Sequence, residues 1–341
     1  MFINNSKDIK RRSKMKFEDF KQLKEFEDFK KLKTLNLKNY EEFKIFYDRI
    51  TGGESHWHYT ANLVVNDLVT QNKYKYVVVD MEDGDKVFIE LKLIQLHKTR
   101  QLRIVNVPVS LNNNDNNIKK ITKHLSSLSY IKGTVKYDDI KYFEDWIVEK
   151  RKEETEHYSE IDAWSEKCDN NKWKTKRRIK WTLNDSNFIF REAVANIDKD
   201  IMINLFNSWC EYKDSKGQHV SNKRLYLKLI DYIGKREDVK GYIMTYKGEA
   251  VALVVYTLHN NTANQIINIS ASRTMLESDN EKVRKIFFDL THQMTWFTYK
   301  ALKKLGFKFI YCGDGTDSKG MEIYKSQCNT NIIEYVKIKP L

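Results

Sequence analysis

The chain has 341 residues, 41% hydrophobic and 13% aromatic, which is typical of a globular protein with room for about two domains. It contains no run of about 18 apolar residues and no apolar core after its charged N-terminal segment, so we expect no membrane span, no secretory signal and a cytoplasmic location. Sixty Lys and Arg against 47 Asp and Glu give a formal net charge of +13, which favours a polyanionic partner such as nucleic acid or an anionic lipid surface.

One feature of the composition offers another explanation for the positive charge. Lys, Asn and Ile are abundant and only 2 prolines occur, so an A+T-rich coding sequence would enrich lysine without any binding role.

The four cysteines (Cys168, Cys210, Cys312 and Cys328) are far apart and form no C-x-x-C pair. We therefore expect reduced thiols, no disulfide framework and no metal.

The first half begins with residues 1–50, where lysine, acidic and Phe or Leu residues alternate in a pattern that predicts an amphipathic helix. Three β-rich runs follow at 73–82, 85–98 and 100–110, joined by tight turns, and they predict an antiparallel meander. After an Asn-rich loop, the sequence predicts a short helix from residue 118 and a strand at 131–137.

The second half repeats this order of elements. Two predicted helices, 198–213 and 221–234, precede predicted strands at 239–246, 249–259 and 264–272. A helix ending near Gly306, a residue suited to a helix C-terminal cap, then leads into a strand at 308–313. The order strand, strand, strand, helix, strand therefore occurs twice, which suggests duplication.

This arrangement resembles the GNAT acyltransferase fold, and its tandem form resembles the Fem-type and phosphatidylglycerol-lysyltransferase-like aminoacyltransferases. The resemblance implies an α/β (α+β) fold of tandem GNAT-like domains, each a mixed, mainly antiparallel sheet flanked by helices. We expect residues 1–165 to form a degenerate N-terminal domain and residues 166–341 to form the C-terminal domain that carries the site.

The stretch YCGDGTDSKGMEIYKSQCN, residues 311–329, contains three of the chain's 12 glycines. The spacing of Gly313, Gly315 and Gly320 fits neither the P-loop nor the dinucleotide-binding pattern. The resemblance instead makes the stretch a connection from strand to helix beside the active cleft. It aligns Tyr324 with the tyrosine that many GNAT enzymes use to protonate the leaving group. In the first half, KYFEDWIVEK (141–150) occupies the corresponding position.

The donor site departs from the GNAT pattern, because no glycine occurs from 249 to 305 to cradle a pyrophosphate. Either side chains such as Arg273 and Arg284 rebuild the acyl-CoA site, or the donor is an aminoacyl-tRNA. The resemblance places the oxyanion contact at the backbone N–H groups near the end of the fourth strand. The expected donor-binding residues are Ile269, Ser270, Ala271 and Arg273. Tyr324 and Asp314 are the expected catalytic residues, with Asp314 or Glu249 as base on position alone.

A basic run, KWKTKRRIKW (172–181), joins the two halves. Its cations neutralise phosphates and its indoles stack bases, so the run is a candidate polyanion contact. A solvated helix face is the alternative interpretation. The expected polyanion-binding residues are Lys172, Lys174, Lys176, Arg177, Arg178, Lys180 and Trp181. His56, His58 and His292 are interpreted as structural histidines.

The sequence contains no G-x-S-x-G elbow and no H-E-x-x-H motif. Taken with the resemblance, it predicts an acyl- or aminoacyltransferase with a polyanionic substrate. DNA with a modified base, in a phage-like chain, is one candidate; tRNA, anionic lipid and peptidoglycan precursors are others. The alternative is a non-catalytic nucleic-acid-binding protein on a degenerate GNAT scaffold, which the missing glycines would permit.

Overall fold

The computed structural model describes residues 14–23, 32–34, 46, 74–96, 99–105, 107–128, 131–163, 184–220, 223–269, 290–314 and 331–341. Contacts divide the described chain into two compact units. Unit 1 holds the described residues up to Glu156 together with Ile332–Leu341, and unit 2 holds those from His157 to Asn331. The two GNAT-like domains predicted at 1–165 and 166–341 stay a prediction in their bounds.

Unit 1 is built mainly from strands. Its elements are β1 (Lys14–Lys16), α2 (Phe17–Lys21), β2 (Lys33–Thr34), β3 (Tyr74–Asp80), β4 (Lys86–Leu96), β5 (Thr99–Ile104), β6 (Val109–Ser110), α6 (Asp115–Ser126), β7 (Ile131–Lys136), the 3-10 helix η3 (Tyr137–Tyr142), β8 (Trp146–Glu160) and β14 (Asn331–Pro340). The boundary with unit 2 falls within β8, and β14 returns the C-terminal end of the chain to unit 1.

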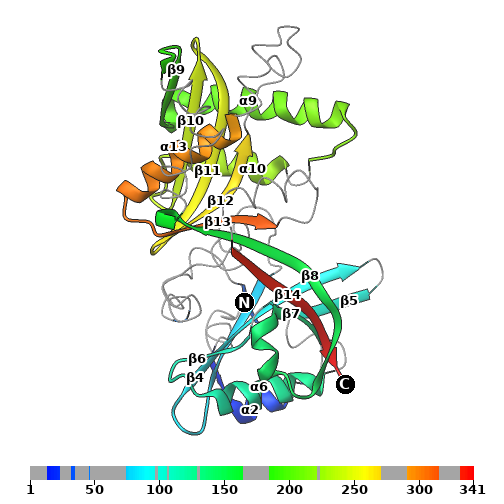
Figure 1. The fold of residues 1–341 in the computed structure, drawn as a ribbon. Coiled ribbons are helices and arrows are strands. Elements are labelled where there is room, and N and C mark those ends of the chain that lie inside the picture. Colours follow the sequence, from blue (N-terminus) through cyan, green and yellow to red (C-terminus); the bar gives the residue numbers. More distant parts are fainter. Residues whose placement is uncertain are drawn as a thin grey trace, which may run out of the picture. The chain divides into compact units, whose positions relative to one another are not determined.

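The strands of unit 1 follow the order β1-β3-β4-β5-β7-β14-β8. Strands β3, β4 and β5 form an antiparallel meander, whereas β5 pairs with β7 in parallel. Helices α2 and α6 lie against this sheet (Figure 1), where Phe20, Ile121 and Leu125 are buried in one core with Val77 and Ile89. The apolar faces of two short helices are thereby covered.

Unit 2 contains longer helices. Its elements are β9 (Phe188–Glu192), α9 (Ala195–Ser215), α10 (Lys223–Tyr232), β10 (Val239–Tyr246), β11 (Glu249–His259), β12 (Thr262–Ile269), α13 (Leu290–Lys304) and β13 (Phe309–Asp314). The strands follow the order β13-β12-β11-β10-β9, with β10, β11 and β12 as an antiparallel meander and β12 paired with β13 in parallel. The pairing scheme of unit 1 is repeated.

The sheet of unit 2 is covered on both faces (Figure 1). Val254 and Tyr256 of β11 pack with Met294 and Tyr299 of α13 in one core. The intervening residues of β11 point the other way, are also buried, and lie on the side where α9 and α10 contact the sheet. A central strand buried on both faces explains the continuous apolar run of β11.

Several sequence predictions are confirmed. Strands 239–246 and 249–259 match β10 and β11 residue for residue. Lys247 and Gly248 both have positive φ, as a tight hairpin turn requires, and Gly306 after α13 has φ 87°. Both halves show three strands, a helix and a strand in the predicted order, with the short strand β6 added before the helix in unit 1, and the predicted mixed, mainly antiparallel sheets flanked by helices are present.

Other predictions are wrong in part. The predicted helix over residues 1–50 is present at Phe17–Lys21, but Lys33–Thr34 is a strand that pairs with Tyr76 and Lys75 of β3. The single strand predicted at 100–110 is two strands, β5 and β6, because β6 leaves β5 to pair with β4. The resemblance matches the run at 141–150 to the connection from strand to helix in the second half. The run instead ends a 3-10 helix and begins the long strand β8.

Candidate active site

In unit 2 the two parallel strands β12 and β13 pair only near their beginnings. The pairs are Thr262 with Phe309, Ala263 with Ile310 and Asn264 with Tyr311. Beyond these pairs β12 runs on to Ile269 and β13 runs on to Asp314. Two adjacent strands therefore stop pairing toward their carboxyl ends, which leaves backbone groups of both strands outside that ladder.

A bulge in β12 sets which side chains face α13. Val255 of β11 pairs with Ile267, but the next residue, Tyr256, pairs with Gln265, so Ile266 is the extra residue. Residues three apart in a regular strand point to opposite faces. Here the extra residue places Gln265 and Asn268 on the same face of the sheet. On that face they lie beside their partners in β11, Tyr256 and Val254.

A row of hydrogen bonds follows from this arrangement. The Asn268 Nδ2 donates to Gln265 Oε1 (3.4 Å), and Gln265 Nε2 donates to the Tyr256 hydroxyl (3.3 Å). Tyr256 donates to Thr298 Oγ1 of α13 (3.0 Å), which donates to the Met294 carbonyl (2.9 Å). Burial raises the pKa of Tyr256 well above its usual value, so its hydroxyl stays protonated.

Some of the predicted site residues lie at the carboxyl ends of β12 and β13, and others lie elsewhere. Ile269 is buried at the end of β12, and Asp314 is the last residue of β13, so both lie at the carboxyl ends of adjacent parallel strands. Glu249 is exposed at the first position of β11, and His292 is partly buried in the first turn of α13.

The other predicted residues fall outside the described residues. These are Tyr324, Ser270, Ala271, Arg273, Lys172, Lys174, Lys176, Arg177, Arg178, Lys180 and Trp181. Their roles stay predictions. The residues that sequence reasoning missed are Tyr256, Gln265, Asn268 and Thr298, and no signal in the sequence marks them, because the bulge that brings Gln265 and Asn268 together has no distinct residue pattern.

Among the described residues of unit 1, the parallel strands show no such opening. Its pairs, Leu102 with Ile131 through Ile104 with Gly133, reach the last residue of β5. The chain then turns away to form β6, which pairs with β4. In the described part of unit 1, β5 therefore has no unpaired extension comparable to that of β12.

The N-terminus of α6 in unit 1 is satisfied by the protein's own side chains. Asn114 caps the helix, and the buried Asp85 carboxylate accepts hydrogen bonds from Ser110 Oγ (2.6 Å), Asn112 N (3.0 Å) and Asn117 Nδ2 (3.0 Å). Burial acts to raise the pKa of Asp85, but these bonds outweigh it and hold the pKa below its usual value. The first N–H groups of α6 thus bond to Asn114, and an internal carboxylate lies against Asn117 of the same helix turn, so an anionic ligand there would meet a capped helix and a negative charge.

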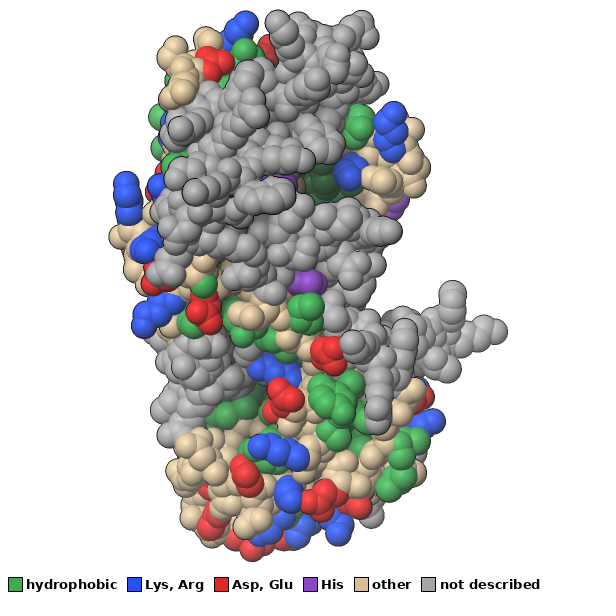
Figure 2. All heavy atoms as spheres, viewed as in Figure 1, with side chains coloured by type: hydrophobic (Ala, Val, Ile, Leu, Met, Phe, Trp, Pro, Cys, Tyr) green, Lys and Arg blue, Asp and Glu red, His purple; other side chains and the backbone are tan. Residues whose placement is uncertain are grey.

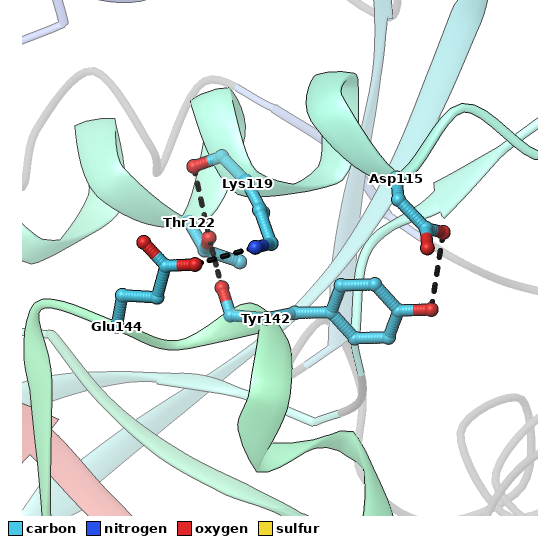
Figure 3. Close-up of polar contacts among 5 residues, drawn as sticks. All are labelled: Asp115, Lys119, Thr122, Tyr142 and Glu144. Atoms are coloured by element: carbon cyan, nitrogen blue, oxygen red, sulfur yellow. Dashed lines mark hydrogen bonds and ion pairs between the residues drawn. The ribbon is translucent and has the colours of Figure 1, made fainter.

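Unit 1 also carries a surface pocket of about 410 Å³ between α6 and the segment that follows η3. Its lining residues are Asn116, Lys119, Lys120, Thr122, Lys123, Tyr142, Glu144 and Asp145. Figure 3 shows Lys119 paired with Glu144 (2.5 Å) and Tyr142 donating to Asp115 (3.1 Å). The pairing raises the pKa of Lys119 and lowers that of Glu144.

Charges of both signs are also interspersed over the face of unit 1 that Figure 2 shows. The pocket and this face therefore do not present a surface of one sign, as a polyanion contact would. Within the described ranges, no helix is long and apolar enough to cross a membrane. The same residues contain no group of three or more His, Cys, Asp or Glu side chains that could hold a metal ion.

No protein-family model matches the sequence, and no curated protein matches it. Solved structures do match. A conserved protein of unknown function from Bacteroides thetaiotaomicron is 12% identical, with 91% of this chain and 99% of that chain covered and a TM-score of 0.63. FemX is 10% identical, with 79% and 88% covered and a TM-score of 0.56. L-PGS from Bacillus licheniformis is 10% identical, with 91% and 93% covered and a TM-score of 0.56.

These likenesses define the class of fold. The chain has the tandem GNAT-like fold that the sequence predicted, with the resemblance to Fem-like and lysylphosphatidylglycerol-synthetase-like proteins extending over most of its length. At identities of 10 to 12%, the likeness is one of fold.

Proposed function

We propose that unit 2 carries an acyl- or aminoacyltransferase site at the carboxyl ends of β12 and β13. The observation that carries this proposal is the loss of pairing between these two parallel strands after Asn264 and Tyr311, next to a bulge in β12. Bulges are frequent beside active sites, where they redirect side chains. The tandem GNAT-like fold supports the same assignment.

The reaction joins a nucleophilic amine or hydroxyl to the carbonyl carbon of an activated donor. The new bond forms as the nucleophile loses a proton, and the bond to the leaving thiol or ribose oxygen breaks as that atom gains one. In the proposed arrangement, backbone N–H groups near Ile269 stabilise the oxyanion, and Tyr324 protonates the leaving group. Asp314, at the end of β13, is the proposed base, and Arg273 contacts the donor.

The donor in this proposal is an acyl-CoA or an aminoacyl-tRNA, and the basic run at 172–181 binds a polyanionic substrate. The candidate acceptors are a modified base in DNA, an anionic lipid and a peptidoglycan precursor. Unit 1 supports unit 2 and binds no donor, in keeping with the Asp85 carboxylate beside the N-terminus of α6. The alternative function, nucleic-acid binding without catalysis, rests on the same basic run.

Labelled donors test the proposal. The full-length protein is incubated with acetyl-CoA and, separately, with aminoacyl-tRNA, each in the presence of DNA, anionic vesicles or a peptidoglycan precursor. Transfer of label to one acceptor class supports the proposal and identifies the acceptor. Binding of nucleic acid with neither donor bound nor consumed would favour the alternative function.

A further inference from the structure

The hydrogen bonds between α13 and β12 have a fixed direction. A backbone carbonyl only accepts, so the single proton of Thr298 Oγ1 points toward the carbonyls of Met294 (2.9 Å) and Thr295 (3.1 Å). Thr298 must therefore accept from Tyr256 (3.0 Å). Because the tyrosine has only one proton, its oxygen accepts from Gln265 Nε2 (3.3 Å).

This direction sets the orientation of two side-chain amides. With Nε2 of Gln265 toward Tyr256, its Oε1 faces Asn268 and accepts from Nδ2 (3.4 Å). Asn268 is then oriented with Oδ1 away from the row. That oxygen is buried and has no hydrogen-bond partner within the part of the chain that the structure describes. A buried acceptor without a partner is destabilising, and such atoms in folded proteins call for an explanation.

We infer that Asn268 Oδ1 is a binding contact that accepts a hydrogen bond from the N–H or O–H of the group being acylated. The inference rests on the proposed function. Asn268 lies on the stretch of β12 beyond its last pair with β13 and immediately precedes Ile269, whose N–H is proposed to contact the donor carbonyl. The bulge at Ile266 leaves the Asn268 side chain on the face of β12 that α13 covers, since its partner Val254 packs there.

The chemistry of the side chain fits an attacking nucleophile. When an amine or hydroxyl attacks a carbonyl, a hydrogen-bond acceptor beside its N–H or O–H orients it. An amide oxygen accepts this hydrogen bond without removing the proton. Removal of the proton is left to the base. The oxygen is closed to water in this structure, so the nucleophile reaches it only by displacing a neighbouring group, and no solvent then competes for the contact. Thr298, which does not touch the substrate, is a positioning residue that fixes the polarity of the row.

The test uses hydroxylamine as the probe nucleophile, with acetyl-CoA and aminoacyl-tRNA as separate donors and formation of the hydroxamate as the readout. Each turnover forms a carbon–nitrogen bond and releases the thiol or the tRNA hydroxyl with one proton. Asn268→Leu, which removes the acceptor, should raise the KM for hydroxylamine about five- to tenfold, while the KM for the donor stays within about twofold. Asn268→Asp keeps an acceptor oxygen and should restore most of the affinity.

Thr298→Val provides a test at a distance. Without the acceptor on Thr298, the Tyr256 hydroxyl turns to donate to Gln265, and Gln265 then donates to Asn268 Oδ1. The row is reversed, and Asn268 presents N–H in place of oxygen. This variant should raise the KM for hydroxylamine about as much as Asn268→Leu. Thr295→Val is the matched control, since Thr295 is buried on the same helix and bonds to the Thr291 carbonyl outside the row.

The outcomes separate this inference from the function on which it rests. If the unmodified protein transfers to hydroxylamine from neither donor, the proposed function fails and the inference fails with it. If transfer occurs but Asn268→Leu leaves the KM for hydroxylamine unchanged, or shifts the donor KM equally, the inference alone is wrong.

Discussion

Asp85→Asn should destabilise unit 1 while leaving its shape unchanged. The carboxylate accepts from Ser110 Oγ, Asn117 Nδ2 and the backbone N–H groups of Lys86 and Asn112, at 2.6 to 3.0 Å. Either orientation of the new amide places its NH₂ against two donors. The Ser110 hydroxyl can turn to accept from this NH₂ group. At least one N–H donor of the network nevertheless still points at the NH₂ group and has no acceptor.

The expected cost follows from these contacts. Hydrogen bonds to a charged group contribute about 1.5 to 3 kcal/mol each, and a buried donor left without a partner costs about 1 to 3 kcal/mol. Because part of the network is rescued, we expect Asp85→Asn to lower the free energy of unfolding by about 2 to 3 kcal/mol. Asp80→Asn, at an exposed carboxylate 3.4 Å from Lys86 Nζ, is the matched control and should cost less than about 1 kcal/mol.

The difference in the free energy of unfolding between the unmodified protein and Asp85→Asn should become smaller as the pH falls. The pKa of Asp85 is lowered in the folded state, so its stabilising contribution is complete above the unfolded pKa of about 3.9 and is lost as the pH falls through the lower, folded pKa. Urea unfolding at several pH values, with amide hydrogen exchange in α6 as the local probe, measures both effects. A cost below about 0.5 kcal/mol at pH 7, or a cost that grows on acidification, would mean that the charged Asp85 carboxylate does not stabilise unit 1.

Two further perturbations test the support and binding roles. Trp146 is 8% exposed and donates from Nε1 to the Thr122 carbonyl at 3.1 Å, so Trp146→Ala should lower the free energy of unfolding by about 3 kcal/mol or more; full stability with abolished transfer would instead place the site in unit 1. Replacing Lys176, Arg177 and Arg178 by Ala should weaken polyanion binding and flatten its dependence on salt, because fewer counterions are released. A salt slope equal to that of the unmodified protein would mean that these cations reflect composition alone.

The fold was predictable where local signals agree with the tertiary arrangement. The turn at Lys247-Gly248 and the apolar, β-rich runs on either side gave the bounds of β10 and β11 directly. Gly306 marked the end of α13 because a residue with φ of 87° is rarely anything but glycine. Because these signals identify the order of strands and helices, the resemblance to GNAT-like proteins could be found from the sequence.

The errors arise where tertiary pairing overrides local pattern. The strand at Lys33–Thr34 lies in a lysine-rich stretch with helical periodicity, but its backbone groups pair with β3. The charged run of β8, Glu149 to Glu156, has no alternation of apolar and polar residues and gave no strand signal. The bulge at Ile266, on which the contacts of Asn268 depend, is a property of pairing between strands and has no mark in the sequence.

Acyl transfer in unit 2 is tested most directly by comparing the protein with Tyr324→Phe in a single-turnover assay. Labelled acetyl-CoA and aminoacyl-tRNA are supplied separately with hydroxylamine, and donor affinity is measured in parallel. The substitution keeps the ring and removes only the hydroxyl, so we expect that one donor is consumed and that the rate falls about 10²-fold or more in the variant, with donor affinity nearly unchanged. Consumption of neither donor above the uncatalysed rate would contradict the proposed transferase, and full activity of Tyr324→Phe would contradict the role of Tyr324.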